Sequence, residues 1–290
     1  MKVAVIGGGG MMGARIGEAA MSVGYDVVLI DRSKADAQRG LSQISKDFDK
    51  GVSIGKIPAA MAGMKDQFMA LARTSDSISS VKGADVIVEA VYENRDLKIK
   101  VLTDAEKYAN NSAIIATNTS SISISTLAKS LKAQDRFVGM HFFNPPNVMP
   151  LMEIIPGENT SDATLKAARA FGESLGKTVV DAPDVPGFLA NGLLVPLMCN
   201  ALRMVDSGLA TKEGVDAVTM LGFGFPMGIF KLIDQVGLDT CKDVIEAMRQ
   251  QTTDPLLKDL LKPSPSLDRL VAEGRLGKKV GRGFYDYQAK

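Results

Sequence analysis

The sequence predicts an α/β fold: a doubly wound sheet with a separate, all-helical C-terminal domain. Short β-branched runs alternate with longer helical patterns over the first half of the chain. A glycine-rich turn follows the first of these runs. The pattern becomes mostly helical after the Pro186-Gly187 pair, a dipeptide that commonly marks a turn or loop between elements. We therefore place the domains at residues 1–185 and 186–290.

Five segments of the first domain are strand candidates, and they read as near-continuous apolar runs, as strands covered on both faces do. They are Val3–Ile6, Asp26–Ile30, Asp85–Glu89, Ala113–Ala116 and Arg136–Met140. The helical patterns between them include Ala14–Val23, Ser33–Phe48 and Leu97–Tyr108. This alternation predicts parallel strands joined by helical crossovers.

The second domain contains four predicted helices and one glycine-rich loop at residues 222–228. The helices are Phe188–Asp206, Lys212–Leu221, Phe230–Gln251 and Ser266–Glu273. Pro196 lies inside the first of them, where a kink is expected.

Composition excludes several classes of protein. The 290 residues are 46% hydrophobic and 23% charged, which excludes wholesale disorder. The net charge of +1 shows no overall basic excess, so no nucleic-acid partner is expected. No apolar run of about 20 residues predicts a membrane helix. Cys199 and Cys241 lie too far apart for a metal motif, so we expect buried thiols and no metal.

The N-terminus goes straight into a strand at residues 2–6, without the pattern of a signal or transit peptide. We therefore expect a cytoplasmic location.

The glycine-rich turn has the pattern of a dinucleotide-binding site. Gly8, Gly10 and Gly13 fit G-x-G-x-x-G between a strand and a helix, with Met12 inside the motif. Such glycines allow a tight turn, close approach to a pyrophosphate and close helix packing. Gly7 is one glycine more than the pattern needs, so the frame could be shifted by one.

The second strand ends at Asp31, 18 residues after Gly13. A carboxylate there accepts hydrogen bonds from the ribose hydroxyls of NAD and repels the 2′-phosphate of NADP. The neighbouring Arg32 would favour that phosphate, so the preference for NAD depends on one carboxylate beside one guanidinium.

His141, the single histidine, ends a predicted strand, where open α/β sheets place their ligand crevices. Its imidazole suits proton transfer to and from an alcohol. Glu153 lies inside an apolar segment, where a carboxylate is costly unless it is paired. A pair with His141 would satisfy it, and the alternative is an exposed strand position.

Two further polar features have open interpretations. The run Thr117–Ser121 follows another strand, so it could face the same crevice or simply cap the next helix. Asn191 lies one turn into the first helix of the second domain. It could reach across a cleft or be an ordinary surface residue.

Six motifs in order resemble the L-3-hydroxyacyl-CoA dehydrogenases, most closely the short 3-hydroxybutyryl-CoA dehydrogenase type. The resemblance runs from Val3 to Tyr287. The motifs are the glycine turn, Glu89-Ala-Val-Tyr-Glu93, Ala116-Thr-Asn-Thr-Ser-Ser121, His141-Phe-Phe-Asn-Pro145, Pro186-Gly-Phe188 with Asn191, and Lys278-Lys-Val-Gly-Arg-Gly-Phe-Tyr285.

The resemblance implies a Rossmann-type domain, an NAD cofactor, an acyl-CoA substrate and a homodimer formed through the helical domain. His141 matches the family's catalytic histidine and Glu153 its partner. Ser120 matches a serine that contacts substrate and nicotinamide, and Asn191 an asparagine that holds the substrate. The remaining positions that it implies for the NAD site are Glu93, Lys98, Asn118 and Asn144.

The sequence departs from the family pattern where coenzyme A phosphates are expected. Asp47 and Ile54 replace a small polar residue and a lysine, which leaves Lys50 and Lys56 as the candidate contacts. Gly192 and Lys231 also replace an arginine and a glutamate. The departures around Lys50–Lys56 keep open an NAD-dependent dehydrogenase of a free hydroxy acid or sugar acid. A module that binds NAD without turnover is a further alternative.

Overall fold

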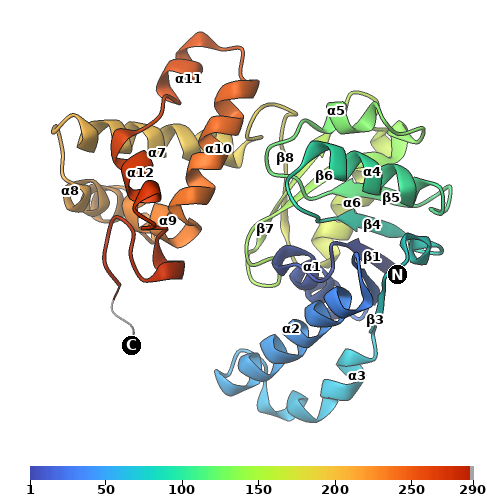
Figure 1. Ribbon diagram of the computed structural model, residues 1–290. Coiled ribbons are helices and arrows are strands. Elements are labelled where there is room, and N and C mark those ends of the chain that lie inside the picture. Colours follow the sequence, from blue (N-terminus) through green and yellow to red (C-terminus); the bar gives the residue numbers. More distant parts are fainter. Residues whose placement is uncertain (288–290) are drawn as a thin grey trace. The chain divides into compact units, whose positions relative to one another are not determined.

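The computed structural model describes residues 1–287, which form two compact units. The first unit runs from Met1 to Asp184, and the second begins at Val185. Figure 1 traces both along the chain. Within the described residues, no helix combines the length and the apolar character needed to cross a membrane.

One eight-stranded sheet, in the order β3-β2-β1-β4-β5-β6-β7-β8, forms the centre of the first unit. Its strands are β1 (Lys2–Ile6), β2 (Asp26–Ile30), β3 (Ala72–Ser75), β4 (Val86–Glu89), β5 (Ile114–Thr117), β6 (Phe137–Phe142), β7 (Leu151–Pro156) and β8 (Thr178–Asp181). All neighbours are parallel except β6 and β7. The short loop between those two strands is sufficient for an antiparallel pair, whereas a parallel pair needs a long crossover.

The predicted doubly wound sheet is confirmed, and its five predicted strands are all present. β7 corresponds to the apolar segment that contains Glu153, which was not among those five. The sequence missed β3 and β8, because both are short edge strands with partly exposed side chains and no apolar run. β6 extends two residues beyond its predicted end at Met140, so His141 lies inside the strand.

The first unit has the helices α1 (Met11–Met21), α2 (Lys34–Ser53), α3 (Lys65–Met69), α4 (Arg95–Glu106), α5 (Ile124–Ala128) and α6 (Asp162–Ser174). All except α3 pack against strands of the sheet and help to bury its apolar side chains. Val5, Val88 and Ala116, from three neighbouring strands, belong to one buried cluster with Ile16 of α1 and Phe171 of α6. This core fixes the strand ends on which the polar candidates lie. The helices α2 and α3 extend away from the sheet (Figure 1).

The second unit is helical, as predicted, and has its own apolar core. Its helices are α7 (Ala190–Asp206), α8 (Lys212–Ala217), α9 (Ile229–Val236), α10 (Leu238–Gln251), α11 (Pro255–Leu260) and α12 (Pro265–Ala272). The prediction of one helix over residues 230–251 was wrong. Gly237 has a φ of 106°, outside the helical region, so it ends α9 and begins α10.

Two buried aspartates fasten the last described residues to this helical unit. Asp216 accepts hydrogen bonds from the backbone N–H of Phe230 (2.7 Å) and from the Tyr285 hydroxyl (3.0 Å). Asp234 accepts hydrogen bonds from the N–H groups of Phe284 (2.8 Å) and Tyr285 (2.9 Å) and from the Tyr287 hydroxyl (2.9 Å). Each charge is thereby satisfied by several donors, as a buried carboxylate requires.

The two cysteines are buried and free, as predicted. Burial raises the pKa of the Cys199 thiol to about 11 and that of the Cys241 thiol to about 12. Neither is a reactive thiolate at neutral pH. No cluster of metal-ligating side chains occurs among residues 1–287.

Candidate active site

The glycine turn presents the open N-terminus of α1. Gly7 and Gly8 donate their N–H groups to Ile30 O at 2.8 and 3.0 Å, which joins the turn to the end of β2. Gly10 caps α1 without a side-chain hydrogen bond, and the first turn holds no acidic residue. A Cβ at Gly13 would collide with the Gly7 carbonyl, so Gly13 is where helix and turn pack closely. This geometry fits an anion such as a pyrophosphate.

Asp31 lies beside this turn at the end of β2. Its Oδ2 accepts a hydrogen bond from Gly9 N and its Oδ1 one from Arg32 N, both at 2.8 Å. The Arg32 side chain is directed to Asp36, whose Oδ2 lies 2.7 Å from Arg32 Nε. Asp36 also pairs with Arg39. Arg32 is thus already engaged with a carboxylate, while Asp31 keeps acceptor capacity beside the turn.

His141 and Glu153 face each other across the antiparallel pair of β6 and β7. His141 Nδ1 and Glu153 Oε2 are 2.7 Å apart, and the two residues are 8% and 1% exposed. Because a carboxylate accepts rather than donates, Nδ1 carries the proton, and Nε2 is the basic nitrogen of the neutral ring. The alternative of an exposed strand position for Glu153 is therefore excluded.

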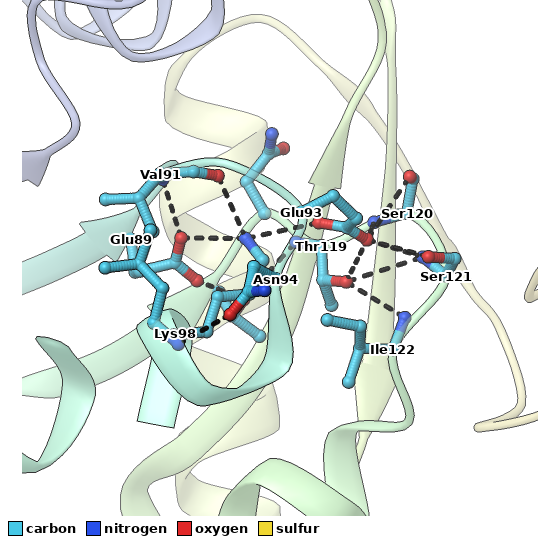
Figure 2. Close-up of polar contacts among 12 residues, drawn as sticks. Glu89, Val91, Glu93, Asn94, Lys98, Thr119, Ser120, Ser121 and Ile122 are labelled. Atoms are coloured by element: carbon cyan, nitrogen blue, oxygen red, sulfur yellow. Dashed lines mark hydrogen bonds and ion pairs between the residues drawn. The ribbon is translucent and has the colours of Figure 1, made fainter. Parts of the chain in front are cut away.

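The loop after β5 wraps around one carboxylate, Glu93 (Figure 2). Glu93 Oε1 accepts hydrogen bonds from Thr119 Oγ1 (2.5 Å), Ser120 N (2.9 Å) and Ser121 N (3.0 Å). Burial acts against the charged form, but Lys98 and the donors of this loop outweigh it. The pKa of Glu93 therefore lies below its ordinary value, and the group is a stable anion.

Lys98 lies between two carboxylates, Glu89 and Glu93 (Figure 2). Its Nζ is 2.8 Å from Glu89 Oε1 and 3.3 Å from Glu93 Oε2. Glu89 also accepts hydrogen bonds from Thr117 Oγ1 (2.6 Å) and Val91 N (2.7 Å). Glu89 and Lys98 are 0% and 1% exposed, so water cannot solvate either charge.

Glu89 was not among the predicted site residues, although its signal was in the sequence. A carboxylate in the apolar run of residues 85–89 carries the same cost as Glu153, and the same reasoning would have required a partner. The polar run after β5 also has a clearer role. Ser123, which lies beyond it, caps α5, and the loop of residues 119–121 surrounds Glu93. Asn118 Oδ1 accepts from Phe142 N (2.8 Å), linking β5 to β6.

A groove of about 620 Å³ lies on the first unit, and both candidate lysines, Lys50 and Lys56, line it. Its other lining residues come from α1, from α2 and the segment after it, and from the loop after β6; they include Arg15, Glu18, Asp47, Ile54, Phe68, Pro145, Asn147 and Val148. Arg15 Nε pairs with Asp47 Oδ2 at 3.1 Å.

The candidates thus fall into local groups: Gly8 to Gly13 with Asp31, Glu93 with Lys98 and Ser120, and His141 with Glu153. Asn144 is exposed in the loop after β6. Asn191 belongs to the second unit, in the first turn of α7, and its role stays a prediction.

Two family models match the chain. Residues 2–185 match the NAD binding domain of 3-hydroxyacyl-CoA dehydrogenase, and residues 187–287 match its C-terminal domain.

Individual relatives agree with these matches. The mitochondrial hydroxyacyl-coenzyme A dehydrogenase of Homo sapiens is 39% identical over 284 residues, covering 97% of this chain and 90% of that protein. A probable 3-hydroxybutyryl-CoA dehydrogenase of Bacillus subtilis is 34% identical, covering 100% and 99% of the two chains. The crystal structure of (S)-3-hydroxybutyryl-CoA dehydrogenase PaaH1 from Ralstonia eutropha is similar with a TM-score of 0.91, 38% identity and 99% coverage of both chains. The chain therefore belongs to the 3-hydroxyacyl-CoA dehydrogenase family and carries the NAD-binding domain of that family.

Proposed function

We propose that this protein interconverts (3S)-3-hydroxyacyl-CoA and 3-ketoacyl-CoA with NAD⁺ and NADH, and that its substrate is the short 3-hydroxybutyryl-CoA. The observation that carries the proposal is the buried His141–Glu153 pair on an NAD-binding sheet. An alcohol oxidation needs a base for the hydroxyl proton, and an imidazole oriented by a carboxylate is such a base.

In this mechanism His141 Nε2 takes the proton of the 3-hydroxyl as C3 loses its hydride. NAD⁺, when bound, supplies the hydride acceptor. Glu153 stabilises the imidazolium through a charge-assisted hydrogen bond at Nδ1. Ser120 and Asn191 orient the oxygen at C3 and the thioester. In the reverse direction His141 returns its proton to the developing alkoxide.

We assign the cofactor to the glycine turn and the ends of the central strands. The open N-terminus of α1 receives the pyrophosphate, and Asp31 receives the ribose hydroxyls. Because Arg32 is engaged with Asp36, NAD is favoured over NADP. Glu93, Lys98 and Ser120 line the nicotinamide end, where the anionic Glu93 favours the cationic oxidised ring.

We assign the coenzyme A arm of the substrate to the groove lined by Lys50 and Lys56. Both lysines offer positive charge for phosphates, and the loop after β6, which leads from His141 to Glu153, forms one wall. Replacing both lysines by methionine is expected to raise KM for the thioester more than it changes kcat.

We further propose a homodimer formed through the helical unit. Leu209, Leu221 and Phe223 of that unit are large apolar side chains that are 71%, 87% and 65% exposed. Where such side chains gather on one face, they are typical of a surface that another chain covers. Light scattering on the purified protein would measure the mass in solution, and a monomer at micromolar concentration would contradict this assignment.

The function is tested by following the oxidation of NADH with acetoacetyl-CoA and, separately, with free acetoacetate. We expect fast turnover of the thioester and slow turnover of the free acid, because binding energy from the coenzyme A arm is used at C3. Equal or faster turnover of a free keto acid would favour the dehydrogenase of free hydroxy acids. Binding of NADH without any turnover would favour a binding module.

A further inference from the structure

The loop that follows β6 is held from two sides within the first unit. Lys177 Nζ donates hydrogen bonds to the carbonyl oxygens of Pro146 (2.5 Å) and Met149 (2.8 Å). From α1, Glu18 Oε2 accepts a hydrogen bond from Asn147 Nδ2 at 2.9 Å. This loop connects the strand of His141 to that of Glu153 and forms one wall of the groove, so its anchors bear on both.

The Glu18–Asn147 contact leaves one polar atom unsatisfied. Asn147 Oδ1 is buried and has no hydrogen-bond partner among the described residues. A buried amide oxygen without a donor is costly. The neighbouring Glu18 is 9% exposed and can act as a donor only when it carries a proton. A carboxylic acid and a primary amide form two hydrogen bonds at once, O–H to amide oxygen and N–H to carboxyl oxygen.

The surroundings of Glu18 favour that proton. Burial raises its pKa to about 7, and the negative charge of Asp47 on α2 acts in the same direction. The hydrogen bond from Asn147 and the positive charge of Arg15 on α1 act against the shift. Lys50 of α2 and Lys56 of the following segment line the same groove. Near neutral pH the carboxyl group is therefore divided between its two forms.

We propose that Glu18 is a positioning residue for the substrate: its neutral form completes the bonding of Asn147, and its charged form loosens the loop and repels an anionic thioester. This inference rests on the assignment of the groove to the coenzyme A arm. It adds a pH-dependent term to substrate binding that is separate from the proton transfer at His141.

The test compares KM and kcat for acetoacetyl-CoA and NADH in the wild-type protein and in Glu18→Gln between about pH 6 and pH 8. Glutamine keeps the size and the donor to Asn147 but carries no charge. We expect the wild-type KM, relative to that of Glu18→Gln, to rise about three- to tenfold over this range, as one unit charge in a partly solvated groove would cause. The ratio of the two kcat values stays constant. Titration of groups other than Glu18 affects both proteins equally and cancels in these ratios.

Two further arms separate the causes. Glu158→Gln removes an exposed carboxylate outside the groove and is expected to follow the wild type at every pH. Asn147→Ala removes two hydrogen bonds from the neutral form of Glu18 but only one from its charged form, so the midpoint of the KM change moves to lower pH. A role in packing alone would shift no midpoint.

A constant ratio of wild-type to Glu18→Gln KM across the range would overturn the inference, as would weaker binding by Glu18→Gln at every pH. Absence of thioester turnover in all variants would instead refute the proposed function. In that case calorimetric binding of coenzyme A at the same pH values still tests Glu18: equal pH dependence in both proteins rejects its role, and a loss of affinity confined to the wild type supports it.

Discussion

The His141 imidazole has its tautomer set by a residue 12 positions away in the chain but directly opposite in the sheet. Because Glu153 is almost fully buried, its carboxylate depends on the imidazole as much as the imidazole depends on it. The sequence predicted this pair from a carboxylate in an apolar run. It did not predict the antiparallel register that places the two side chains face to face.

Replacing His141 by glutamine removes the proposed base and keeps a polar side chain opposite Glu153. We expect kcat to fall by about 10²–10⁴-fold, the usual contribution of a proton-transfer group. Fluorescence titration should give an unchanged Kd for NADH, because His141 is assigned to proton transfer and not to the cofactor. A turnover within a few-fold of wild type would remove His141 from the mechanism.

Asp31 offers a second test at single-residue scale. Asp31→Ser removes the carboxylate that we propose accepts from the ribose hydroxyls and repels a 2′-phosphate. NADH affinity should fall, and the ratio of NADPH to NADH affinity should rise, each measured by fluorescence titration. Arg32→Ala serves as the matched control, since Arg32 is engaged with Asp36 and is expected to change neither affinity much.

At the scale of elements, the ends of β4 and β5 are joined to α4 by charges as well as by apolar packing. Lys98 of α4 forms an ion pair with Glu89 of β4, and Glu89 accepts a hydrogen bond from the Thr117 hydroxyl of β5. The cluster of Glu89, Lys98 and Glu93 carries two negative charges and one positive charge. Removing its single cation would leave a fully buried carboxylate without a counter-charge.

We therefore expect Lys98→Met to lower the free energy of unfolding by about 3–5 kcal/mol, as broken buried ion pairs do. The double variant Glu89→Gln/Lys98→Met should recover part of that loss, because the unpaired charge is gone. Urea denaturation of both variants measures the difference. Equal free energies of unfolding in the single and double variants would show that the unpaired charge of Glu89 does not cause the loss of stability.

Stability should also depend on pH through Glu18, on α1. Its pKa is raised from the model-peptide value of 4.5 to about 7 by burial. The folded state therefore binds more protons than the unfolded state between these values, so stability falls as pH rises through this window and levels off above it. The loss amounts to at most about 3 kcal/mol. Glu18→Gln should lack this loss in urea titrations at about pH 5 and pH 8, and parallel pH dependence in the two proteins would contradict it.

Sequence and structure agree best for elements whose signals are local. The strand of residues 3–6, the glycine turn and Asp31 follow from apolar runs, glycine chemistry and spacing. The edge strands β3 and β8 carry no such signal, because their side chains are half in water. The break between α9 and α10 depends on the positive φ of Gly237. The residues on both sides have a helical pattern, so the sequence predicts one continuous helix.

At the scale of the whole molecule, each unit has a core of its own, and the candidate site residues except Asn191 belong to the first. The sequence identified the residues that end strands or match family motifs. It could not identify partnerships between segments far apart in the chain, such as Glu18 with Asn147 or Asp216 with Tyr285. Those contacts depend on how the helices pack, which local patterns do not encode.

The aspartate contacts of the helical unit have a consequence for synthesis on the ribosome. Asp234 lies some 50 residues before its donors in the chain, which are the backbone N–H groups of Phe284 and Tyr285 and the hydroxyl of Tyr287. A nascent chain that has emerged only as far as Gly283 would have to bury that carboxylate without them. We expect α9 to pack into the core of the helical unit late, after residues 284–287 have left the exit tunnel. Arrested chains of increasing length should therefore become protease-resistant in this unit only once residues 284–287 are free.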